Sequence, residues 1–182
     1  MSKVLIVGVD HFLQNIESYC TTQDGRESEA NQKQSLRARL EELVEKYHPQ
    51  LIAEEAKLDA DCLGKQIAKS HGLKYCNLTM SWEERAKVGV GRDYDRKDET
   101  RQAAYSVFEE FMFEQVEKNR GGAEAILVVC GSYHVCGLAK SFRTAGHEVV
   151  SEDTYYAEWY RGRPLESDGK VEGFYKETYG RL

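Results

Sequence analysis

Short apolar runs recur along the chain, and most of them follow a residue that ends a helix. The first run, Lys3 to Val9, reads KVLIVGV; it is too short for a helix and rich in β-branched residues, which is typical of a strand covered on both faces. The other runs follow a glycine or a proline, which favours a new strand after each break: Leu51 to Ala53, Leu73 to Leu78, Ala125 to Cys130 and His147 to Ser151.

Between these runs, apolar residues recur at helical spacing. Such stripes run from Leu36 to Tyr47, from Ala104 to Val116 and from Val135 to Phe142, with a shorter one at Leu63 and Ile67. Strands that alternate with helices form βαβ units. We therefore predict an α/β fold in which a mostly parallel central sheet is flanked by helices.

Two polar stretches and the end of the chain depart from this pattern. Glu17 to Gln34 and Ser81 to Arg101 are too long for simple connections, so we expect loops that cover a site or move. The segment 153–182 is rich in tyrosine and has no clear period, which predicts an irregular tail that could form a hairpin at the sheet edge. A chain of 182 residues favours a single domain, with a core over 3–152 and this tail.

Composition narrows the function classes. The formal net charge is -6 and basic residues form no block, which argues against a nucleic-acid partner. No apolar run approaches the roughly 20 residues of a membrane span, and the start of the chain lacks a signal-peptide core, so we expect a cytoplasmic protein. The cysteines form no CxxC pair and are expected to be reduced and buried: Cys20, Cys62, Cys76, Cys130 and Cys136.

The most informative motif is G-x-x-H, which occurs twice. Gly8 to His11 follows the first predicted strand, and Gly131 to His134 follows the fourth. In a parallel sheet, ligands bind outside the carboxyl ends of the strands. Both histidines are therefore expected at the ligand-binding edge, where a helix that begins after His134 would also present backbone N–H groups.

Two carboxylates, Glu54 and Glu55, end the second predicted strand. Strand alternation sends them to opposite faces, so one of them can reach the edge that carries the histidines. Two imidazoles and a carboxylate suit a divalent metal with open coordination positions, and they equally suit metal-free acid–base chemistry. In a purely structural alternative, each histidine bonds backbone and the glutamate caps a helix.

Other polar residues are weaker candidates. Arg92 lies in a glycine-rich segment that follows no strand; it and Arg101 could fold over the edge and pair with an anionic substrate. The aromatic tail could line a pocket, form a homodimer contact or pack at the edge. The remaining histidines have positions that helix-end interactions explain: His48, His71 and His147.

The motifs resemble those of the superfamily of TraB/PrgY and TIKI proteins, whose relatives include the haem-binding lipoprotein ChaN and the erythromycin esterases. Gly8 to His11 and Gly131 to Leu138 resemble its two G-x-x-H motifs. Pro49 to Ala56 resembles its P-x-x-x-x-x-E segment and places the family glutamate on Glu55. The segment Phe111 to Val116 is similar to the family's Glu-Arg pair, except that Gln115 replaces the arginine.

The resemblance implies an α/β core in which the histidines and the glutamate cluster, and metal-dependent protease or esterase activity as described for some members. It spans most of residues 3–150. Loss of the arginine at Gln115 would remove a charge-assisted clamp.

These inferences define a working hypothesis, a cytosolic metal-dependent hydrolase for a small molecule or a peptide. His11, Glu55 and His134 would hold the divalent metal. The proton acceptor would be Glu54 or Asp10, and Tyr133 would stabilise developing charge. The predicted substrate contacts are Arg92, Gln115 and Ser132. The alternative is a non-catalytic module that binds a small ligand, a cofactor or a metal in the same crevice.

Overall fold

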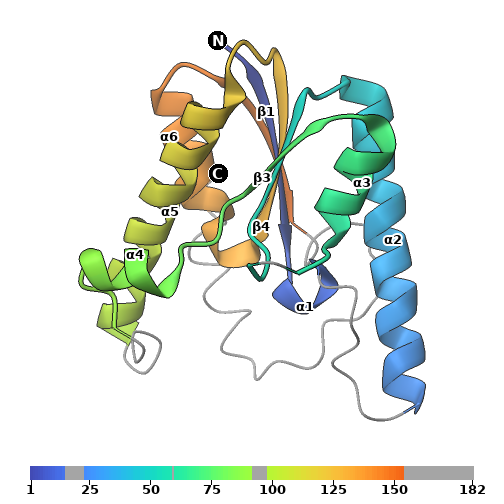
Figure 1. The fold of residues 1–182 in the computed structure, drawn as a ribbon, viewed down its shortest axis with the longest axis horizontal. Helices are drawn as coiled ribbons and strands as arrows, with labels where there is room; N and C mark the ends of the chain where they lie inside the picture. The colour runs from blue at the N-terminus through green and yellow to red at the C-terminus, as the bar shows by residue number, and fades with distance from the viewer. Residues whose placement is uncertain (15–22, 59, 92–97, 154–182) are drawn as a thin grey trace.

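Five parallel strands form the centre of the molecule, in the order β3-β2-β4-β1-β5 (Figure 1). The structure is a computed structural model, and it describes residues 1–14, 23–58, 60–91 and 98–153. The strands are β1 (Lys3–Val9), β2 (Leu51–Glu54), β3 (Lys74–Asn77), β4 (Ala125–Gly131) and β5 (Glu148–Asp153). The α/β fold with a parallel sheet predicted from the sequence is confirmed.

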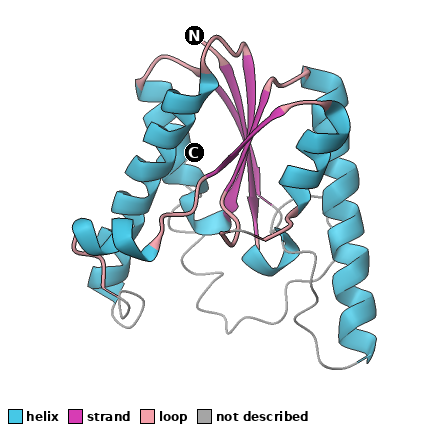
Figure 2. Ribbon diagram, in the orientation of Figure 1, coloured by secondary structure: helices cyan, strands magenta, loops and turns pink. Residues whose placement is uncertain are grey.

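Helices cover both faces of the sheet (Figure 2). Their bounds are α1 (His11–Gln14), α2 (Gln23–Tyr47), α3 (Leu63–His71), α4 (Trp82–Lys87), α5 (Asp98–Arg120) and α6 (Val135–Thr144), with a 3-10 turn η1 (Ser132–His134) before α6. Helices α2 and α3 pack on one face, and α5 and α6 on the other (Figure 1). No helix among the described residues is long and apolar enough to cross a membrane.

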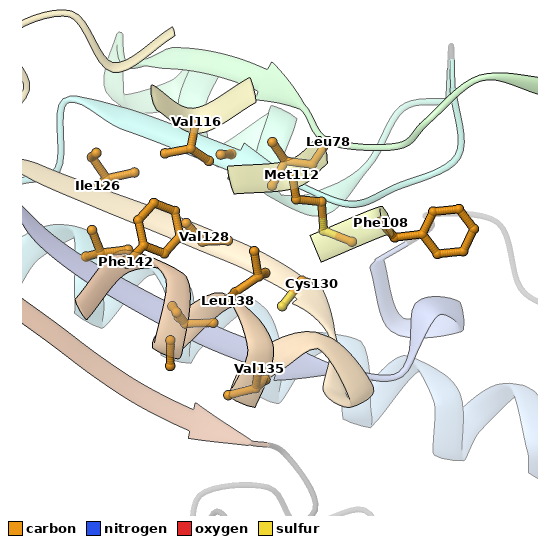
Figure 3. Packing of buried hydrophobic residues seen from close by; sticks show 14 of the residues in the cluster. Leu78, Phe108, Met112, Val116, Ile126, Val128, Cys130, Val135, Leu138 and Phe142 are labelled. Atoms are coloured by element: carbon orange, nitrogen blue, oxygen red, sulfur yellow. The ribbon is translucent and has the colours of Figure 1, made fainter. Parts of the chain in front are cut away.

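The alternation of side chains along the strands divides the core into two clusters. On β4, Leu127 and Val129 join the cluster under α2 and α3, whereas Ile126, Val128 and Cys130 join the cluster under α5 and α6. Figure 3 shows the second cluster, in which Phe142 of α6 lies beside the β4 side chains. All seven residues of β4 are buried, as expected for a central strand covered on both faces.

The structure corrects the prediction that the two polar stretches are loops. Most of the first is helical, because α2 begins at Gln23, and the buried side chains of Glu29 and Gln32 continue its inner face with polar residues. Part of the second forms α4, whose Ser81 accepts from the Glu84 backbone N–H in a capping box. The segments 15–22, 92–97 and 154–182 lie outside the described residues, so the expectations for Arg92 and the tail stay predictions.

At the amino ends of the strands, polar contacts add to the apolar packing. His147 accepts from the Ser2 backbone N–H at 3.1 Å through Nδ1, and its Nε2 lies 3.1 Å from Glu117. Gln50 accepts from the backbone N–H groups of Glu124 and Ala125. His147 also makes the helix-end interaction that the sequence predicts, because its backbone N–H donates to the Phe142 carbonyl of α6 at 3.0 Å. Its role is therefore structural. The four described cysteines, from Cys62 onward, are free thiols, as expected.

Close packing at Gly8 gives a test of the fold. A Cβ at this position would lie 2.4 Å from Val135 and 3.2 Å from the Ser132 backbone, so alanine must displace η1 and α6 from β1. We expect Gly8→Ala to lower the free energy of unfolding by about 1–3 kcal/mol, measured by chemical denaturation. The matched control, Gly122→Ala, places its Cβ in open space and should change stability by less than about 0.5 kcal/mol. Equal stability of the two variants would contradict this packing.

Candidate functional site at the carboxyl end of β4

The carboxyl end of β4 lies where the chain connections diverge to opposite faces. The connections that leave its neighbours β1 and β2 lead to α2 and α3, whereas the connection that leaves β4 leads to α6 on the other face. A crevice outside the strand ends at such a point is the usual ligand site of an open parallel sheet. Strands β2 and β1 both pair with β4, one on each side.

Glu55 joins the ends of β2 and β4. Its backbone N–H donates to the Val129 carbonyl at 2.8 Å, and its Oε2 accepts from the Gly131 backbone N–H at 2.9 Å. The other carboxylate oxygen, Oε1, lies 3.7 Å from Nε2 of His134. The structure therefore brings together Glu55 and His134, two of the three residues proposed as metal ligands.

His134 is 4% exposed and lies between two carboxylates. Its Nδ1 is 3.4 Å from Oε1 of Glu109, which projects from α5. The rings of Tyr105 and Phe108 meet the imidazole edge to face, with centroids 5.0 and 6.3 Å away. Glu109, His134 and Glu55 thus form one line of ionisable groups, and two aromatic rings pack against the imidazole.

Gly137 provides the room for Glu109. A Cβ on this residue of α6 would lie 1.7 Å from a carboxylate oxygen of Glu109. The carboxylate therefore fills the place that any other side chain at position 137 would take. This packing explains the glycine that follows the second G-x-x-H motif.

The carboxylates determine the charge of His134. Burial lowers the pKa of the imidazole, but the charge of Glu55 and the hydrogen bond and charge of Glu109 raise it more, so the pKa lies above its ordinary value of 6.5. A metal ion at Nε2 would have to displace a proton, which makes metal affinity fall with acidity.

Ser132 and Tyr133 differ in their surroundings although they are adjacent. Ser132 is buried and donates to Oδ1 of Asp153 at 2.9 Å, which ties η1 to the end of β5. Tyr133 is 40% exposed and stacks on Tyr105 with centroids 5.7 Å apart. Of the two, only Tyr133 is placed where a hydroxyl group can meet a molecule from solvent.

Glu54 points away from this edge, as strand alternation predicts. It is completely buried under α3, where its carboxylate accepts from the backbone N–H groups of Gly64 at 3.1 Å and Lys65 at 3.3 Å. Burial raises the pKa of Glu54, although these bonds and those from Cys62 and Tyr75 oppose the rise. The contacts identify Glu54 as the cap of α3, and the structure does not bring it to His134.

The surroundings of Glu54 also make the neighbouring Cys62 thiol unreactive. Cys62 lies 3.0 Å from the Tyr75 hydroxyl group, and burial together with the charge of Glu54 raises the pKa of the Cys62 thiol to about 12. A thiol with so high a pKa is a poor nucleophile at neutral pH.

The other predicted site residues are not gathered at His134. Gln115 lies less than two turns beyond Glu109 on α5, roughly 9 Å further along the helix axis. It lies toward the amino ends of the strands, where Glu117 meets His147. The His11 side chain and Arg92 lie outside the described residues. The backbone of His11 begins α1 directly after β1, beside β4, so its position at this edge is confirmed while its orientation stays a prediction. Asp10 precedes it at the same edge.

Sequence reasoning missed Glu109 and Tyr105. Helix α5 carries several glutamates, and the sequence does not by itself show which of them faces α6. The buried stripe Ala104, Phe108 and Met112 places Tyr105 and Glu109 on the flank of the inner face. The spacing of this stripe, together with the glycine at position 137 of α6, is the sequence signal that points to Tyr105 and Glu109.

The donor set is partly suited to a divalent metal. Two ligand atoms that share one ion at about 2.1 Å lie roughly 3.0–3.4 Å apart, so the 3.7 Å between Nε2 and Oε1 needs an adjustment of only a few tenths of an ångström. The Glu109 contact to Nδ1 is the orienting interaction that metal-binding histidines commonly make. No group of three His, Cys, Asp or Glu side chains with metal-binding geometry occurs within the described parts of the chain. A third protein ligand would therefore have to come from outside that set.

Comparison of the chain with protein-family models, with curated proteins and with solved structures finds no match.

Titration of His134 tests the geometry of the site. Its imidazole pKa should exceed 6.5 in the metal-free protein, and Glu109→Gln should lower it, measured by NMR of the imidazole resonances. Because the pKa is raised on folding, the stability that the charged ring contributes is complete below about pH 6.5 and is lost as pH rises through the folded pKa. Glu109→Gln should weaken this pH dependence. The control is Glu110→Gln, which changes an exposed neighbour; equal pKa values in both variants would contradict the arrangement.

Proposed function

We propose that the protein is a small metal-dependent hydrolase whose site lies at the carboxyl end of β4. His134, Glu55 and His11 would hold the ion, as the resemblance to the TraB/PrgY and TIKI superfamily also implies. The observation that carries the proposal is the line Glu109, His134, Glu55, in which one ring nitrogen meets an orienting carboxylate and the other faces a carboxylate oxygen. The expected substrate is a small molecule or a peptide, and the expected location is the cytoplasm.

The protein groups have distinct tasks in this proposal. A divalent ion supplies Lewis acidity, which polarises a scissile carbonyl or phosphoryl group and acidifies water. Glu109 accepts a hydrogen bond from Nδ1–H of His134 and so directs the lone pair of Nε2 toward Glu55. The Gly131 N–H fixes one oxygen of Glu55, which leaves the other to face the ion.

Proton transfer and charge stabilisation fall to residues around this pair. Asp10 is the preferred proton acceptor, because Glu54 is committed to capping α3. Tyr133 is half exposed beside Tyr105 and can donate a hydrogen bond to charge that develops on the substrate. Ser132 is bonded to Asp153, which favours a role in holding η1 over direct substrate contact.

The burial of His134 also favours a second candidate, a non-catalytic binding module. An imidazolium between two carboxylates is a satisfied buried ion network, and such a network can shape a binding site without turning over a substrate. The two functions differ in one observable, which is turnover that depends on added metal.

The deciding experiment is a panel of ester, peptide and phosphoester substrates assayed with a chelator and with added Zn²⁺ or Mn²⁺. We expect metal-stimulated turnover, a loss of at least about 100-fold in His134→Ala and in Glu55→Gln, and a loss of about 10- to 100-fold in Glu109→Gln. His71→Ala removes an exposed histidine on α3 and should leave turnover unchanged. Turnover that resists the chelator and survives His134→Ala would contradict the hydrolase, and metal binding without turnover would favour the module.

A further inference from the structure

A cleft opens on the face of the sheet opposite His134, where α1, α2 and α3 meet. Its volume is about 260 Å³. Because α1 follows β1 and α3 follows β2, this cleft lies toward the carboxyl ends of the strands, but it is separated from His134 by the sheet itself. The residues that line it are Leu13, Gln14, Lys33, Gln34, Arg37, Leu63 and Gln66.

The lining combines an apolar floor with a cationic wall. Leu13 and Leu63 are buried and form the apolar part. Lys33 and Arg37 lie one helical turn apart on α2 and therefore project from the same side of the helix. Among the described residues that line the cleft none is acidic, although the chain as a whole has a net charge of -6.

The guanidinium of Arg37 is held in place across the cleft. Its Nη2 donates to Oε1 of Gln66 at 2.5 Å, and Gln66 in turn donates to Asp61 at 2.9 Å. The Glu41 carboxylate lies 3.7 Å from Nη1. A guanidinium has five N–H donors in a planar fork, more than these two contacts use, so an oriented Arg37 can also receive an oxyanion.

Lys33 adds a second cation next to this fork. Its Nζ lies 2.5 Å from Oε1 of Glu29, whose side chain is almost completely buried. That carboxylate fixes the lysine at the cleft and offsets part of its charge. Arg37 is therefore the main anion-binding group, and Lys33 supports it.

We propose that this cleft binds a small organic anion, with its carboxylate or phosphate group on Arg37 and Lys33 and a short apolar portion on Leu13 and Leu63. The volume is just below the roughly 300–1,000 Å³ of typical ligand pockets, which limits the ligand to a small molecule. The site shares no residue with the Glu109, His134 and Glu55 line, so it stands whether or not the protein is a hydrolase.

The test is an NMR titration of the full chain with hexanoate and with butyl phosphate, which present the two kinds of oxyanion on short apolar chains. Hexanol is the neutral control. We expect saturable shifts of backbone amides in α2 and α3 with at least one anion, and binding of hexanol at least about tenfold weaker. Saturation by only one of the anions identifies the oxyanion that the cleft prefers.

Two variants separate loss of the site from loss of the fold. Arg37→Gln removes the fork, and Gln66→Glu keeps the partner of Arg37 but adds a negative charge to the lining; each should weaken anion binding at least about tenfold. Lys140→Gln removes an exposed positive charge from α6 on the far face and should leave binding unchanged. Thermal unfolding of each variant reports whether the fold is intact.

The proposal would be overturned by the absence of saturable binding for both anions, or by hexanol binding as tightly as they do. It would also be overturned if both Arg37→Gln and Gln66→Glu bound the anions as the unmodified chain does, or if the shifts mapped to η1 and α6.

Discussion

The complete burial of β4 is the constraint on which the rest of the molecule depends. The strand is paired on both sides and covered on both faces, so along its length it tolerates only apolar side chains and satisfied backbone groups. On β4 itself, polar side chains can enter only where the strand ends, at Gly131 and the turn that follows. The helices that follow the strand ends pack on opposite faces on either side of that point.

Two adjacent glutamates, Glu54 in the last position of β2 and Glu55 directly after it, show how alternation assigns different roles to the same type of side chain. Glu54 faces α3, where backbone N–H groups in the first turn of the helix donate to its carboxylate. Because these hydrogen bonds satisfy the carboxylate, it can be buried in the core. Glu55 faces the other side and bonds the Gly131 N–H, so it joins two strand ends and presents one oxygen to His134. A shift of one residue in the register of β2 would exchange these positions and dismantle both.

The sequence was sufficient for the strands because runs such as Ala125 to Cys130 are too short for a helix and too apolar for a loop. The sequence also predicted Glu55 and His134 at one edge of the sheet, because parallel strands end on the same side. The first half of α2 was missed because its inner face is continued by buried polar residues, including Glu29 and Gln32, and an apolar stripe is absent there. Glu109 was missed because its contact with His134 depends on how α5 packs on α6 over Gly137, a tertiary relation that spacing along one helix does not contain.

The proposed function requires Glu55 and His134 to bind one metal ion. Anomalous diffraction from crystals soaked in Zn²⁺ or Mn²⁺ tests it directly, because the signal places the ion independently of any assay. We expect one strong peak about 2.0–2.2 Å from Nε2 of His134 and from Oε1 of Glu55, with the hydrogen bond between Nδ1 of His134 and Glu109 retained. Crystals saturated with metal that show no peak at this pair, or a peak only at exposed surface side chains, would contradict it.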